Sequence, residues 1–155
     1  IMEAGKDSAL LPIGLGARNT LRLEAKLMLY GNELDDAISP VEAGLKWAMD
    51  INKDFIGKGR ALREIENKPA RTLVGFEMEE RAIPRHGYAI FAGDEEVGIV
   101  TSGTFAPFLE KYLGLGYVSR SHRKRGTQIE ISIRGKNKRA VIVKTPFYKK
   151  QYKKN

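Results

Sequence analysis

The chain has 155 residues, of which 42% are hydrophobic, and 27 Lys or Arg residues against 19 Asp or Glu residues give a net charge of +8. This composition predicts one domain or two small ones with a packed core, and it excludes a chain that stays disordered for lack of apolar residues. The absence of cysteine excludes disulfides, thiolate zinc sites and cysteine nucleophiles, and two histidines make a multi-histidine metal centre improbable.

Charge is unevenly distributed along the chain. The segment 119–155 holds thirteen Lys or Arg residues and a single acid, Glu130, whereas the first 118 residues hold 14 basic and 18 acidic residues. A basic end beside a mildly acidic body is typical of a protein with an anionic partner, although a solvated lysine-rich surface gives the same composition. No nucleic-acid-binding motif accompanies the charge.

The first part of the chain is predicted to be helical with loops. Apolar residues recur at helical spacing from Ala17 to Met28, and they also alternate from Leu21 to Leu29 as in a strand. Because the residue types are good helix formers, we expect a helix over 17–26. The segment 32–40 is expected to be a polar loop, whose acids lack the order of a calcium-binding loop.

Two further elements lie before residue 70. The segment 41–49 contains Trp47, the only tryptophan, and is typical of a short strand; composition favours a core position for this side chain over a wall for an aromatic ligand. A second helix is predicted over 58–66, ended by Asn67 and Pro69.

The pattern changes after Pro69 to alternating apolar residues. Turn signals at Gly93-Asp94 and at 135–138 separate apolar runs, as in hairpins. We expect strands near 71–79, 88–92, 96–102, 113–118, 127–134 and 139–145. This spacing predicts a small antiparallel barrel or sandwich after a helix-containing segment, which is an α+β fold.

Local motifs give few candidates for chemistry. The run Gly-Leu-Gly-Ala-Arg at 14–18 lacks the third glycine of a dinucleotide-binding fingerprint, but an arginine at the head of a helix can hold a carboxylate or phosphate. His86 and His122 are expected to be turn or surface residues. No nucleophile–base pair, carboxylate dyad or metal-ligand cluster stands out, so the residues alone indicate an α+β chain that binds an anionic, aromatic ligand.

A longer set of motifs resembles the aminomethyltransferase family, the T-protein of the glycine cleavage system. The similarity covers nearly the whole chain in order, with Asn19 where the family usually has aspartate. It is carried by GLGARNTLRLEA at 14–25, LYGNEL at 29–34, SPVEAGLKW at 39–47, DFIGK at 54–58, IPRHGY at 83–88, VG at 97–98 with VTSG at 100–103, LGYV at 115–118 and KTPFY at 144–148.

The resemblance implies that this chain is the C-terminal portion of a longer enzyme. It implies residues 1–68 as the C-terminal part of the folate-binding domain and residues 69–155 as the C-terminal β-barrel domain. The family's reaction transfers the methylene of an aminomethyl group, carried on the lipoyl arm of H-protein, to tetrahydrofolate with release of ammonia. Its reactive aspartate lies in the earlier half, so we expect no catalytic residue here and no turnover by this piece alone.

The resemblance also implies three residues that bind folate or substrate. Arg18 matches an arginine that contacts the substrate, Trp47 an aromatic residue lining the folate cavity, and Tyr152 a tyrosine of the C-terminal tail. Tetrahydrofolate is expected as the co-substrate, without a metal. Lipoylated H-protein is expected as the partner, steered by basic residues such as those at 123–125, with no nucleic acid or membrane.

Two alternatives stay open. One is the folate-binding domain of a dimethylglycine or sarcosine dehydrogenase-like enzyme, and the other is a non-catalytic basic β-barrel binding module. A cytoplasmic location is expected for a bacterial or archaeal source, and the mitochondrial matrix for a eukaryotic one.

Overall fold

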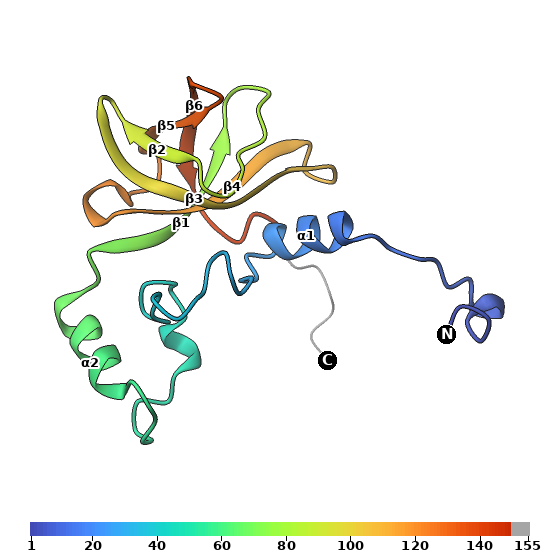
Figure 1. Ribbon diagram of the computed structural model, residues 1–155, viewed down its shortest axis with the longest axis horizontal. Coiled ribbons are helices and arrows are strands. Elements are labelled where there is room, and N and C mark those ends of the chain that lie inside the picture. The colour runs from blue at the N-terminus through green and yellow to red at the C-terminus, as the bar shows by residue number, and fades with distance from the viewer. Residues whose placement is uncertain (150–155) are drawn as a thin grey trace.

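Six antiparallel strands close into a barrel in the second half of the chain, and two helices with long connecting loops form the first half (Figure 1). The computed structural model describes residues 1–149. Its elements are the 3-10 turn η1 (Lys6–Ser8), α1 (Leu15–Glu24), the 3-10 turn η2 (Lys46–Ala48), α2 (Lys58–Asn67), β1 (Arg71–Met78), β2 (Ala89–Ala92), β3 (Glu95–Ala106), β4 (Lys111–Ser119), the 3-10 turn η3 (Arg120–His122), β5 (Gln128–Ile133) and β6 (Lys136–Val143).

The barrel follows the strand order β1-β4-β3-β2-β5-β6 and closes where β6 pairs with β1. Alternation along the strands places one set of side chains inside, as Ile129 and Ile131 of β5 show by being fully buried. Phe76 and Ile90 fill the same interior at 0% exposure. The expected α+β class and the antiparallel barrel are confirmed, because alternation and hairpin turns are local signals that the closed sheet satisfies.

The strand bounds differ from expectation in two hairpins. β6 spans Lys136–Val143 instead of 139–145, so the turn between β5 and β6 is shorter than the expected 135–138. The other difference is in β3 and β4. The predicted strands 96–102 and 113–118 are the central parts of β3 and β4, which extend to Ala106 and begin at Lys111. Pairing from Gly103 with Gly114 to Ala106 with Lys111 continues beyond the predicted ends, so the hairpin reaches further out of the barrel. Its extended part is the surface against which α1 packs (Figure 1).

Helix α1 lies across the barrel beside β3 and β4 and begins two residues before the predicted 17–26 (Figure 1). Gly14 is its extended N-cap, and Lys26 in the left-handed conformation ends the turn that follows it. The face against the barrel carries Arg22, Leu23 and Glu24, all buried. The apolar stripe that predicted the helix points elsewhere, since Leu21 is 64% exposed. We call Leu15 and Leu21, which also line a cavity beside this helix, the outward face of α1.

The prediction of a short strand over 41–49 is wrong. The chain there forms a tight turn, in which Leu45 N–H donates to the Pro40 carbonyl and Gly44 takes a φ of +75°, followed by η2. A strand would need extended angles at the glycine and a pairing partner, and the turn provides neither. Trp47 lies on η2 with 82% of its surface exposed, so the core position favoured by composition is also wrong.

Helix α2 agrees with the predicted 58–66 to within one residue, and β1 begins after Pro69 as expected. Among residues 1–149, the structure contains no helix that combines the length and the apolar character needed to span a bilayer.

Substitution of Gly98 by alanine should destabilise the barrel. A Cβ at this position in β3 would overlap the backbone carbonyl oxygen of Tyr117 in β4, and paired backbone cannot move aside as a flexible side chain would. We expect Gly98→Ala to lower the free energy of unfolding by about 3 kcal/mol, measured by urea denaturation. Gly16→Ala is the control, because no atom lies within 4 Å of its Cβ; a loss as large there would contradict the argument.

Glu24 predicts a pH dependence of stability. Its residue is 4% exposed, and burial raises the pKa of its carboxyl group above the ordinary value. The folded state therefore binds this proton more tightly than the unfolded state, and stability falls as pH rises from the unfolded pKa through the folded one. Glu24→Gln should be more stable than the unsubstituted chain at pH 7, with the difference vanishing near pH 4. The exposed Glu66→Gln should show no such pH-dependent difference in parallel urea titrations.

Candidate functional site

A cavity of about 690 Å³ opens at the N-terminal end of α1. Its apolar walls come from the segment 13–15 and from Leu21 and the segment 27–29, and two guanidinium groups, those of Arg18 and Arg22, line it as well. The two arginines are four residues apart, so they lie one helical turn apart on the same side of α1. A cavity with apolar walls and a few positioned charges suits a ligand with an aromatic body and an anionic group.

The guanidinium of Arg22 is fully occupied by protein groups. Nη1 donates to Glu33 Oε2 at 2.7 Å, and Nη2 donates to the hydroxyl of Ser102 on β3 at 2.7 Å. Nε and Nη2 both donate to Asn19 Oδ1, at 3.0 and 2.7 Å. Arg22 therefore ties α1 to the barrel, while Arg18 is exposed and, within residues 1–149, has no acidic partner within 4.0 Å.

Glu33 is the other half of this buried pair and has no exposed surface. Its Oε2 also accepts from Leu29 N–H at 3.0 Å, which holds the loop after α1 against the helix. Among the described residues its Oε1 has no hydrogen-bond partner. Asn32 donates to Ser102 Oγ at 3.1 Å and to the Thr101 carbonyl at 2.9 Å, so the loop binds the same point on β3.

Asn19 has a defined role in this arrangement. An amide oxygen accepts both hydrogen bonds from Arg22 without adding a second negative charge beside Glu33. The single amide oxygen of Asn19 therefore keeps the acceptor function that an aspartate carboxylate would supply.

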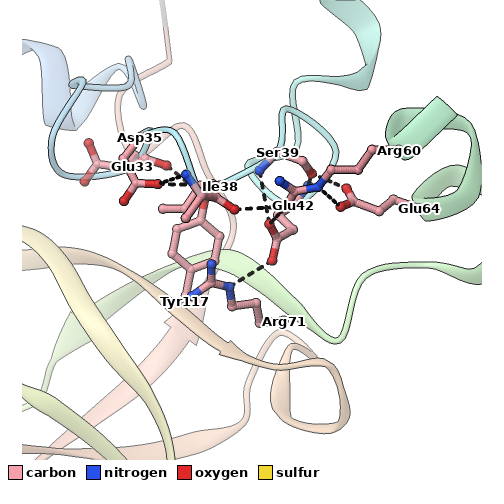
Figure 2. A network of polar contacts seen from close by, with 10 residues as sticks. Glu33, Asp35, Ile38, Ser39, Glu42, Arg60, Glu64, Arg71 and Tyr117 are labelled. Carbon is pink, nitrogen blue, oxygen red and sulfur yellow. Dashed lines mark hydrogen bonds and ion pairs between the residues drawn. The ribbon is translucent and has the colours of Figure 1, made fainter. Parts of the chain in front are cut away.

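A second polar network lies beside the first and is centred on Glu42 (Figure 2). Its carboxylate accepts from Arg71 Nε at 2.8 Å, from Arg60 at 3.3 Å and from Ser39 N–H at 3.1 Å. The Arg71 guanidinium lies over the ring of Tyr117, 5.1 Å from its centroid. These contacts connect the loop before η2 and the helix α2 to the first residue of β1.

Tyr117 joins the two networks. Its hydroxyl donates to the Glu33 carbonyl oxygen at 2.9 Å, while its ring carries the Arg71 guanidinium (Figure 2). Burial raises the pKa of this hydroxyl, and the negative charge of Glu42 acts in the same direction, so the group stays a donor across the physiological range.

The residues singled out from the sequence are not gathered in one place. Arg18 lines the cavity, but Trp47 lies on η2 and is not among the lining residues. Tyr152 lies outside the described residues. His86 is exposed, with Nδ1 2.9 Å from the Thr101 carbonyl oxygen, and His122 lies in η3 against the Ser119 hydroxyl. No cluster of three or more His, Asp or Glu residues in the described part of the chain could hold a metal.

Sequence reasoning missed Arg22 and Glu33 as a site. The segment 32–40 is a loop as expected, but Glu33, one of its acids, is fully buried. A buried ion pair between residues eleven apart leaves no periodic signal, because its partners meet only through the path of the loop.

Breaking the buried pair should be costly. Glu33→Gln removes the charge that balances Arg22, and an unpaired buried guanidinium is strongly unfavourable. We expect the free energy of unfolding to fall by about 3 kcal/mol in urea denaturation at pH 7. The exposed pair of Lys58 and Asp54 serves as the control. Asp54→Asn should change the free energy of unfolding by less than about 0.5 kcal/mol. Equal effects of the two substitutions would refute the assigned role.

Comparison with known proteins gives a consistent family. The family model described as the glycine cleavage T-protein C-terminal barrel domain matches residues 71–149, and the model of the GCVT N-terminal domain matches residues 1–53. Curated relatives include the aminomethyltransferases of Geobacillus sp. (strain WCH70), 51% identical over 97% of this chain and 42% of the relative, and of Caldanaerobacter subterraneus, 52% identical over 99% and 41%.

A solved structure shares the fold. The crystal structure of the glycine cleavage system aminomethyltransferase T from Bartonella henselae superposes with a TM-score of 0.90 at 33% identity, covering 97% of this chain and 43% of that one. The chain spans about two-fifths of the length of the relatives it matches. The barrel-domain model matches more than half of the residues of this chain, and the N-terminal-domain model matches the helical segment before it. The chain therefore belongs to the glycine cleavage T-protein family.

Proposed function

We propose that this chain supplies part of the tetrahydrofolate site of an aminomethyltransferase of the glycine cleavage system. The observation that carries the proposal is the match of nearly the whole chain, at about half identity, to relatives named aminomethyltransferase. In the proposed reaction, one folate nitrogen attacks the methylene carbon of the aminomethyl group on the lipoyl arm of H-protein, and the carbon–nitrogen bond breaks to release ammonia. A second folate nitrogen then bonds to the same carbon while its carbon–sulfur bond breaks, which releases methylenetetrahydrofolate and leaves the lipoyl arm as the reduced dithiol. For the bacterial setting of these relatives, we propose a cytoplasmic location.

Arg18 is the residue of this chain proposed to hold the substrate. Its guanidinium lines the cavity and is not occupied by an acid of residues 1–149, whereas Arg22 beside it is. A planar cation there is suited to a carboxylate, which it can bind through two parallel hydrogen bonds. The apolar walls from Ile13 to Leu29 are suited to the ring system of a folate.

Trp47 and Tyr152 stay proposed folate contacts. The indole of Trp47 is open for stacking, but a ligand that touches both Trp47 and Arg18 must extend beyond the cavity at α1.

We propose residues 1–68 as the part of the chain that belongs to the folate-binding domain and residues 69–155 as the barrel domain. The reacting acid is proposed to come from the part of the relatives that this chain does not span, so the chain alone should show no turnover.

A chimera tests this function. The chain would replace the matching stretch of the Geobacillus aminomethyltransferase, and methylenetetrahydrofolate formation from aminomethyl-loaded H-protein would be measured. We expect activity in the chimera and none in the isolated chain. Arg18→Gln should lower kcat/KM for tetrahydrofolate by about 10–100-fold, the loss expected for a charged hydrogen bond. Arg63→Gln, an exposed arginine of α2, is the matched control. An inactive but folded chimera, or equal effects of the two substitutions, would overturn the assignment.

A further inference from the structure

The barrel seam between β1 and β6 is only partly closed. β1 pairs with β4 from Arg71 to Glu77, but it pairs with β6 only from Gly75 to Met78. Beyond that point β6 turns to the loop before β5: Gly126 N–H donates to the Ile142 carbonyl at 2.8 Å, and Ile142 N–H donates to the Thr127 carbonyl at 3.0 Å. The two strands separate there, and the loop 120–127 lies beside the opening.

A cleft of about 490 Å³ occupies this opening. One wall is the first half of β1, residues 72–75, and the other is the end of β6 with Thr145. The rim is formed by Arg120, Ser121 and the run Arg123-Lys124-Arg125. The volume lies within the range of small-molecule sites.

The charge of the cleft is not neutralised by neighbours. Among residues 1–149, none of its four basic residues has an acidic group within 4.0 Å. Arg71, at the start of β1, is by contrast paired with Glu42. No acid is among the residues of the described part of the chain that line the cleft. Four cations around one opening repel one another, and an anion placed between them removes that repulsion.

The loop that carries these cations is held by its backbone. Arg120 N–H donates to the Ala70 carbonyl at 2.9 Å, and Thr127 N–H donates to the Lys124 carbonyl at 3.1 Å. Gly126 has a φ of +85°, which completes the turn into β5. The backbone of the loop would not have to become ordered when an anion binds, so the ordering cost is confined to the basic side chains.

We propose that this cleft binds a small phosphate-bearing anion. Arginine side chains hold phosphate through paired hydrogen bonds, and a group with two negative charges gains from several cations at once. Thr72 and Thr145, two residues of the walls, carry further hydroxyl donors, whereas the Ser121 hydroxyl already contacts Ser119 Oγ at 3.2 Å and His122 Nδ1 at 3.0 Å. A single-stranded nucleic acid is disfavoured, because none of the described residues that line the cleft is aromatic and such ligands depend on base stacking. This site lies apart from the cavity at α1, and the proposal does not rest on the proposed transferase activity.

Calorimetric titration of the isolated chain with pyrophosphate tests the site, at an ionic strength held constant with sodium chloride. We expect saturable binding of one pyrophosphate per chain, weakened at least tenfold in Arg123→Gln/Arg125→Gln. Lys46→Gln/Arg63→Gln removes the same two charges from exposed positions of η2 and α2, and it should weaken binding less than twofold. Coincident circular dichroism spectra and thermal midpoints would show that all three proteins are folded.

The outcomes distinguish a site for a small phosphate-bearing anion from a nucleic-acid surface. Absence of saturable pyrophosphate binding, or equal weakening in the two double variants, would overturn the proposal. A twelve-nucleotide single-stranded DNA is titrated in parallel. If it binds more tightly than pyrophosphate and loses affinity in Arg123→Gln/Arg125→Gln, the cleft is a nucleic-acid surface and the small-anion proposal fails.

Discussion

The buried ion pair of Arg22 with Glu33 determines how the first half of the chain sits on the barrel. It joins α1, the loop that follows it and β3 at one point, through the Ser102 hydroxyl. Two charges removed from water are tolerated only when their hydrogen bonds are largely met, and here Asn19 and the Leu29 amide complete most of them. Because Arg22 is anchored in this way, the neighbouring turn of α1 has a fixed orientation, and with it the free guanidinium of Arg18.

The barrel supplies the rigid side of this arrangement. Its interior is filled by aliphatic and aromatic side chains such as Phe76 and Ile90, and the long β3–β4 hairpin extends from it to receive α1. Tyr117 of β4 serves both halves, with its hydroxyl bonded to the Glu33 carbonyl and its ring beneath Arg71. The segment that holds α1 and the loop after it therefore makes few apolar contacts within itself. Its position depends on polar contacts with β3 and β4.

The parts of the fold that follow from local patterns could be predicted, and those that depend on distant partners could not. Strand alternation and hairpin turns predict β2 and β5 to within one residue at each end, and α2 agrees to one residue. Trp47 was misplaced because tryptophan burial is a statistical preference that a glycine-containing turn overrides. The burial of Glu33 could not be predicted, because it depends on Arg22 and the residues between the two carry no sign of the pairing. Arg18 was found from a motif, yet nothing in the sequence indicates that Arg22 beside it is already occupied.

The outward face of α1 affects how solutions of this polypeptide behave. Leu15 is 82% exposed and Leu21 64%, so water must surround apolar side chains on a helix whose other side is already covered. Contacts between such faces on separate molecules release that water, which makes the attraction between molecules entropic near room temperature. Clustering driven in this manner weakens on cooling and strengthens in sulfate, so cold, low-sulfate buffers should keep the polypeptide dispersed.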